Sequence, residues 1–107
     1  MDRNYGGVVW TNHALDRLRE RGIKQGDAWA TFSNPQQARY AATKGGWVYW
    51  RDWGNWRIEV VAKRNERKEW VILSVWSSPT DKRQAALWVG DRLERLLQLL
   101  LGRFRRR

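Results

Sequence analysis

The chain has no cysteine, and its 107 residues include a single histidine. The lack of cysteine excludes disulfides, thiolate zinc sites and a cysteine nucleophile. One histidine cannot build a metal centre from imidazoles. The eleven acidic residues show no paired spacing of the kind that indicates a magnesium-dependent nuclease. We therefore expect no metal ion and no cofactor, so any catalysis by this chain is expected to be metal-free.

Long apolar runs are missing as well. No stretch reaches the roughly 18 apolar residues that a membrane-spanning helix needs. The first residues, Met1–Asn4, lack the apolar core of a signal peptide. These two absences predict a soluble, cytoplasmic protein with no membrane span. A chain of 107 residues has the length of one domain with one hydrophobic core, and we assign residues 1–107 to a single domain.

Positive charge is in clear excess. Lysine and arginine number 21 against 11 acidic residues, which leaves a formal net charge of +10. Such a charge attracts polyanions, and nucleic acids are the most common polyanions in a cell. RNA is therefore the expected partner, with anionic membrane surfaces as the competing one.

Helix signals gather near the N-terminus. A helix is expected over residues 12–21, because Thr11 or Asn12 can cap its start and Gly22 can close its end. A second short helix falls within residues 23–33 and is stopped by an Asn-Pro pair.

Strand signals fill the middle of the chain. Alternating and β-branched residues predict strands over residues 47–51, 56–63 and 70–77, with one further edge strand over 38–43. The connecting loops are short and polar, as antiparallel hairpins require. The predicted fold is α+β, with two short N-terminal helices, an antiparallel meander of three to four strands and a long C-terminal helix.

The last third of the chain carries the signals of that long helix. Ser78–Asp81 offers an N-cap, a proline at the first helical position and an acid in the first turn. Apolar residues then follow one stripe to about Leu101, and a basic tail ends the chain. The expected unit, residues 78–107, follows a core of residues 11–77. Its stripe can pack on the sheet, form a homodimer or partner-helix surface, or lie on anionic lipid.

One face of the first predicted helix combines an imidazole with two guanidinium groups. His13, Arg17 and Arg21 are four residues apart, which places them in an arc of roughly 80° beside the buried stripe. A titratable imidazole next to two permanent cations is a candidate site for a phosphodiester. The alternative is a solvated face on which the arginines pair with Asp16 and Glu20.

Strand alternation sorts the side chains of the predicted sheet into two faces. In the strand over 56–63, Ile58 and Val60 share one face, while Glu59 and Val61 share the other. In the last strand, alternation places a set of four residues on one side: Trp70, Ile72, Ser74 and Trp76. The second, mixed face of the sheet is the one expected to carry a ligand.

Nine tryptophans are an unusual number for this length. Four of them, from Trp47 to Trp56, recur at every third position, a period that fits neither a strand nor a helix. One or two of these rings should therefore be exposed, and exposed rings beside cations stack on unpaired bases at roughly 1–3 kcal/mol per base. Cross-strand packing is the alternative use. The candidate nucleic-acid-binding residues are Trp50, Trp53, Trp76, Arg57 and Lys63.

Several blocks of this chain resemble the domain-of-unknown-function 4258 (DUF4258) family. They are NHALDRLRERGI, a second short helix ending in NP, then GGWVYWR, IEVVA and VILSVW, and they span roughly residues 11–76. That family in turn looks like the BrnT and RelE type of toxin ribonuclease, in which helices precede a curved antiparallel sheet. The resemblance does not cover the helix expected after Ser78.

The resemblance implies a metal-independent endoribonuclease that cleaves RNA by attack of its own 2′-hydroxyl. It assigns the acid/base role to His13, phosphate stabilisation to Arg17, Arg21 and Arg51, and an orienting hydroxyl to Ser74. It also implies an acidic antitoxin protein as partner. Two other classes stay open: a non-catalytic module that binds RNA or other single-stranded nucleic acid through basic and tryptophan side chains, and a structural protein that associates through its C-terminal stripe.

Overall fold

The computed structural model describes residues 1–80. Two α-helices, two short 3-10 helices (η) and five strands follow one another in this part of the chain. In order they are η1 (Tyr5–Gly7), β1 (Val9–Trp10), α1 (Asn12–Arg21), α2 (Gln25–Ser33), β2 (Gln37–Ala41), η2 (Ala42–Lys44), β3 (Gly46–Trp53), β4 (Trp56–Arg64) and β5 (Trp70–Pro79).

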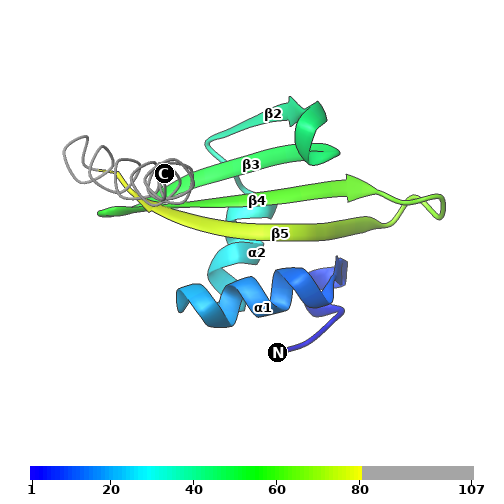
Figure 1. The fold of residues 1–107 in the computed structure, drawn as a ribbon, viewed down its shortest axis with the longest axis horizontal. Coiled ribbons are helices and arrows are strands. Elements are labelled where there is room, and N and C mark those ends of the chain that lie inside the picture. The colour runs from blue at the N-terminus through cyan, green and yellow to red at the C-terminus, as the bar shows by residue number, and fades with distance from the viewer. Residues whose placement is uncertain (81–107) are drawn as a thin grey trace, which may run out of the picture.

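The strands form one mixed sheet in the order β1-β5-β4-β3-β2 (Figure 1). The neighbours from β2 to β5 are antiparallel, whereas β1 runs parallel to β5 and pairs Val9 with Val71 and Trp10 with Ile72. The predicted antiparallel meander of three to four strands is therefore wrong, and the two helices are not the first elements because η1 and β1 precede them. A strand of two residues shows no alternation, so only its pairing with β5 reveals it.

Helix α1 is defined by capping residues at both ends and packs on the core through its apolar side. The Thr11 side chain caps its start, and Gly22 adopts a left-handed φ of 63° at its end, where its N–H bonds to the last turn. Its buried residues, Ala14, Leu15 and Leu18, face the core. Figure 1 shows α1 alongside β5, the strand next to the parallel edge strand, while α2 crosses behind the sheet.

The core lies between the two helices and one face of the sheet. Trp10, Leu18 and Ile72 are fully buried in it. Partly buried aromatic rings from α2 and the sheet surround this core, among them Phe32, Tyr49 and Trp70, whose rings meet edge to face. No helix within residues 1–80 is both long enough and apolar enough to cross a membrane.

The predicted start of the C-terminal helix is wrong. Ser78 and Pro79 belong to β5, where they pair with Arg57 and Trp56. The Thr80 N–H continues the contact by donating to the Asn55 carbonyl at 2.8 Å. Pairing with β4 therefore overrides the local capping signal, and proline fits because it stands at the strand's end. The remainder of the predicted helix, the basic tail and the homodimer surface assigned to them lie outside the described residues.

A bulge in β5 decides which side chains share a face. Val61 pairs with Ser74, but Ala62 pairs with Ile72, so Leu73 is an extra residue in the ladder. Beyond it the alternation changes phase: Trp70 and Ile72 face the core and so does Val75. The prediction that Ser74 and Trp76 share a face with Ile72 is thus wrong, because the period of two is interrupted at Leu73.

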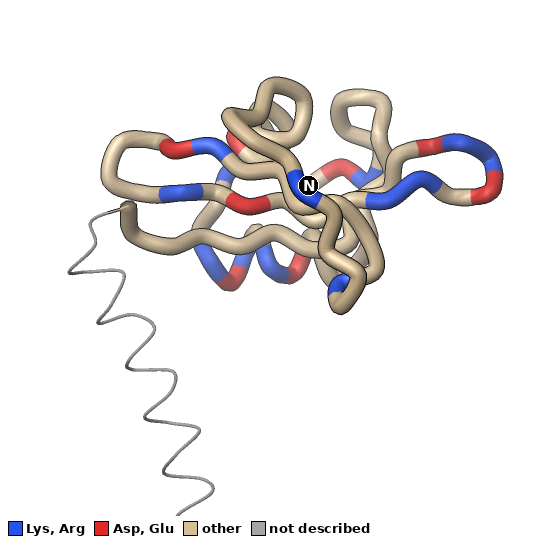
Figure 2. Tube along the Cα trace, turned by 90° about the horizontal axis from the view of Figure 1, so that it is seen from above, with Lys and Arg blue, Asp and Glu red and all other residues tan. Residues whose placement is uncertain are grey.

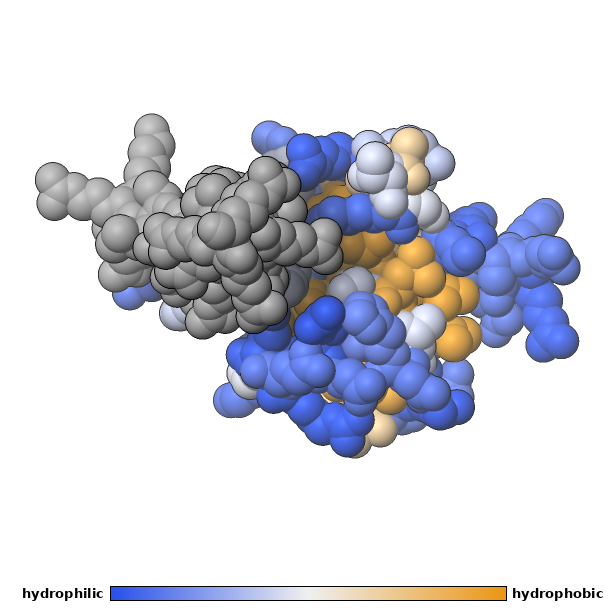
Figure 3. All heavy atoms as spheres, viewed as in Figure 1, coloured by the Kyte–Doolittle hydropathy of each residue, from blue (hydrophilic) through white to orange (hydrophobic). Residues whose placement is uncertain are grey.

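We call the side of the sheet opposite α2 the open face. Residues paired across the strands on this side are Trp50, Glu59, Val61, Ser74 and Trp76. In β4, Glu59 and Val61 lie here while Ile58 and Val60 lie in the core, as alternation predicts. Figure 3 shows apolar residues in the middle of this face with hydrophilic residues on both sides. The visible part of the open face therefore has an apolar middle bordered by hydrophilic residues.

Candidate functional site

A pocket of about 380 Å³ lies on the open face. It is bounded by α1 on one side and η2 on the other, with β4 and β5 as its floor. Its lining residues are His13, Lys44, Glu59, Val61, Leu73, Ser74 and Trp76. The structure thus brings together three of the residues singled out from the sequence, His13, Ser74 and Trp76, although His13 lies about sixty positions from the other two in the chain.

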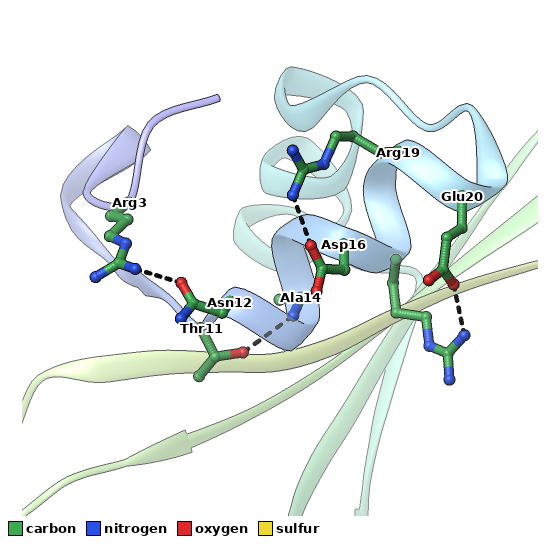
Figure 4. A network of polar contacts seen from close by, with 8 residues as sticks. Arg3, Thr11, Asn12, Ala14, Asp16, Arg19 and Glu20 are labelled. Carbon is green, nitrogen blue, oxygen red and sulfur yellow. Dashed lines mark hydrogen bonds and ion pairs between the residues drawn. The ribbon is translucent and has the colours of Figure 1, made fainter.

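Thr11 fixes the position of His13 relative to β5. Its hydroxyl lies 2.9 Å from the Ile72 carbonyl and 3.2 Å from the Leu73 carbonyl, at the bulge. The same oxygen accepts the Ala14 N–H at 3.1 Å, which caps α1 (Figure 4). One side chain therefore ties the first turn of α1 to the bulge that turns Ser74 toward the pocket.

We expect Thr11→Val to lower the free energy of unfolding by about 0.5–2 kcal/mol, the range for loss of an N-cap. It should also slow any reaction in the pocket, since the first turn of α1 loses its link to the bulge. Thr11→Ser keeps the hydroxyl and should keep most of the stability. Urea unfolding of the three proteins measures this, and equal midpoints for Thr11→Val and the parent would contradict the link.

The arginines of α1 differ in their surroundings. Arg17 pairs with Glu20 at 2.7 Å, and the side chains are 35% and 57% exposed. Arg19 pairs with Asp16 at 2.6 Å on the same helix (Figure 4). Such exposed pairs are worth about 0–1 kcal/mol, so a phosphate can compete for Arg17.

Arg21 and Arg51 differ in how close they lie to the pocket. The Arg21 guanidinium lies 3.1 Å from the centre of the Trp76 ring, which places a cation beside the pocket. Arg51 pairs in register with Ile58, whose side chain is in the core, and its guanidinium lies 4.7 Å from the Trp53 ring. The structure therefore brings Arg21 next to Trp76, although Arg21 also lines a second pocket with Trp53 and Ile58 of the core side. It does not bring Arg51 to the open face.

Trp50 is the second aromatic residue of the open face. Two guanidinium groups flank its ring, with Arg57 5.5 Å and Arg39 5.9 Å from the ring centre. Arg57 is held by Asp52 at 2.7 Å. That hydrogen bond raises the pKa of Arg57, with burial opposing the shift. The result is an aromatic ring between permanent cations, the combination that stacks on bases and attracts phosphates.

The two remaining predicted binding residues lie elsewhere. Trp53 donates its indole N–H to the Thr31 hydroxyl at 2.9 Å and packs against the core. Lys63 lies near the end of β4, in a different pocket lined by the residues of the β4–β5 loop. Figure 2 shows alternating basic and acidic residues along this loop. Neither residue lies in the His13 pocket.

Lys44 and Glu59 line the pocket but were not among the predicted site residues. For Glu59 a signal exists, because strand alternation places it beside Val61 on the mixed face. For Lys44 no local signal exists, since only the pairing of β2 with β3 carries η2 over the open face. Within residues 1–80, no three histidine, aspartate or glutamate side chains are grouped to hold a metal ion.

The family model described as "Domain of unknown function (DUF4258)" matches residues 10–77. The chain belongs to this family. The match runs from the end of β1 into β5 and includes every residue that lines the pocket of the DUF4258 domain. Neither the curated proteins nor the solved structures contain a match to the chain.

Proposed function

We propose that this DUF4258 protein binds single-stranded RNA on the open face and cleaves it without a metal ion, as an endoribonuclease of the BrnT and RelE toxin type. The observation that carries the proposal is the placing of the single histidine in a pocket with Ser74 and Lys44. A cationic aromatic pair, Arg21 on Trp76, lies beside them. An exposed imidazole, a hydroxyl and an ammonium around one hollow are suited to a phosphodiester.

The reaction requires a base, an acid and positive charge around the phosphorus. His13 takes the proton of the 2′-hydroxyl, and the resulting oxygen attacks the adjacent phosphorus. The bond from phosphorus to the 5′-oxygen breaks, and that oxygen takes a proton from the Lys44 ammonium. Arg17 and Arg21 stabilise the charge of the phosphorane, and Ser74 orients a phosphate oxygen. The products are a 2′,3′-cyclic phosphate and a 5′-hydroxyl, and solvent returns the proton from His13 to Lys44.

The test is incubation of the purified full-length protein with end-labelled RNA in the presence of a chelator. We expect cleavage products whose 3′ ends carry a 2′,3′-cyclic phosphate, because the attacking group is the 2′-hydroxyl of the RNA itself. RNA with a 2′-deoxy nucleotide at the cleavage position is the matched control and should stay intact. Absence of products with the chelator, or products ending in a 3′-hydroxyl, would contradict the proposal.

A non-catalytic RNA-binding module is the second candidate. The observation in its favour is the distribution of cations: Arg51 lies away from the pocket, and Arg17 is paired with Glu20. Trp50, with its two flanking arginines, needs no chemistry to hold a base. This candidate predicts salt-sensitive RNA binding without products in the same assay.

The ribonuclease proposal also includes a protein partner. A toxin of the BrnT and RelE type would have an acidic antitoxin, whose carboxylates complement the net charge of +10.

A further inference from the structure

Glu59 lies between the two tryptophans of the open face. It pairs in register with Trp50 on β3 and with Trp76 on β5. Neighbouring strands are about 4.8 Å apart, and paired residues point to the same side of a sheet. The Glu59 side chain therefore rises from the floor with an indole ring on each side. It also lines the same pocket as His13.

The Glu59 carboxylate takes part in no ion pair within residues 1–80, although its charge also acts on Arg57. The three ion pairs within residues 1–80 are Arg17–Glu20, Arg19–Asp16 and Arg57–Asp52. Arg57, the cation next to Glu59 along β4, is thus bonded to a different carboxylate. A partly buried acid on a face that binds phosphates weakens RNA binding by repulsion. Hydrogen bonds that the carboxylate accepts from the RNA must therefore offset the binding free energy lost to this repulsion.

We propose that Glu59 recognises the base next to the scissile phosphate and selects guanine. This inference rests on the proposed function of the same pocket. A carboxylate only accepts hydrogen bonds, and it can accept two in parallel. Guanine presents two adjacent donors on its Watson–Crick edge, N1–H and the N2 amino group, so it matches both oxygens. Uracil presents one donor between two carbonyl oxygens, which repel a carboxylate. Adenine and cytosine offer one amino group and are intermediate.

The register of the sheet is consistent with a phosphate bound beside Ser74 and a neighbouring base bound beside Glu59. Ser74 pairs with Val61, and Trp76 pairs with Glu59, so the two rows are two residues apart along the strands. Two residues of a strand span about 7 Å, close to the length of one nucleotide in an extended single strand. A phosphate at the His13 and Ser74 row therefore puts a neighbouring base at the Glu59 row. There the indole ring of Trp50 provides a surface for stacking.

The test measures binding to short 2′-O-methyl oligouridines that carry one central guanine, adenine, cytosine or uracil, so that no cleavage interferes. We expect the full-length protein to bind the guanine oligonucleotide about tenfold more tightly than the all-uridine one. Glu59→Gln should bring the two affinities to within about threefold of each other, mainly by strengthening binding to uridine, because the repulsion between the carboxylate and the uracil carbonyl groups is gone.

Glu66→Gln is the matched control, since it makes the same change of charge in the β4–β5 loop, away from the His13 pocket. It should keep the full preference for guanine. Binding of all four oligonucleotides with equal affinity would overturn the role of Glu59 and leave the ribonuclease proposal intact. Binding of none of them would overturn RNA as the ligand of this face. A preference for guanine that survives Glu59→Gln would assign the selection to another residue.

Discussion

Replacing His13 by alanine should lower the rate of RNA cleavage by about 10²- to 10⁴-fold, the contribution of a positioned acid/base group, with little change in RNA affinity. The single histidine of the chain has no substitute in the pocket, because the other polar side chains that line it are a lysine, a serine and a glutamate. Single-turnover cleavage with saturating protein measures the chemical step, and fluorescence anisotropy of a labelled non-cleavable RNA measures affinity.

The substitution should leave the fold intact. His13 is exposed, and α1 is capped by Thr11 rather than by the imidazole. Arg19→Ala is the control on the same helix, because Arg19 pairs with Asp16 and does not line the pocket. It should cleave RNA at nearly the parent rate. Equal rates for His13→Ala and the parent would rule out the histidine as the acid/base group and favour a binding module.

The sequence predicts those parts of the fold that local signals determine. Helix α1 has its cap, its apolar stripe and its closing glycine within twelve residues, so its range of Asn12–Arg21 follows directly. The strands β3, β4 and β5 follow from alternation. What cannot be predicted depends on partners distant in the chain. The two residues of β1 are a strand only because β5 lies beside them, and Ser78 and Pro79 extend β5 only because β4 offers pairing partners.

In the candidate site, too, local signals place some residues and pairing with distant strands places the others. Helical spacing alone puts His13 and Arg21 on one face of α1, and in the structure His13 lines the pocket while Arg21 contacts Trp76 beside it. The facing of Arg51 depends on the phase of β3, which the pairing of Tyr49 with Val60 and of Arg51 with Ile58 sets toward the core side. The side chains of Ser74 and Trp76 face the pocket because of the bulge at Leu73. A bulge changes every later side chain of a strand to the other face, and single-sequence alternation contains no signal for it.

Trp10→Ala should cost about 3–5 kcal/mol of unfolding free energy, the range for removal of a buried tryptophan. Trp10 is 1% exposed in the centre of the core, and its indole N–H donates to the Tyr5 carbonyl at 2.9 Å. The substitution leaves a cavity and removes one of the two hydrogen bonds that the Tyr5 carbonyl accepts. It also weakens β1, which precedes the Thr11 link to the bulge. Urea unfolding followed by circular dichroism measures the loss.

Trp47→Ala is the matched control for that loss, because Trp47 is 43% exposed on β3 and contacts Tyr40 of the edge strand. It should cost less than about 1 kcal/mol, as surface substitutions usually do. If the two variants unfold at the same urea concentration, the core does not depend on β1. If only Trp10→Ala is destabilised, and the folded fraction that remains cleaves RNA more slowly than the parent, β1 has a second role. It then holds Thr11, and through it His13, against the bulge of β5, so the catalytic geometry depends on the two-residue strand.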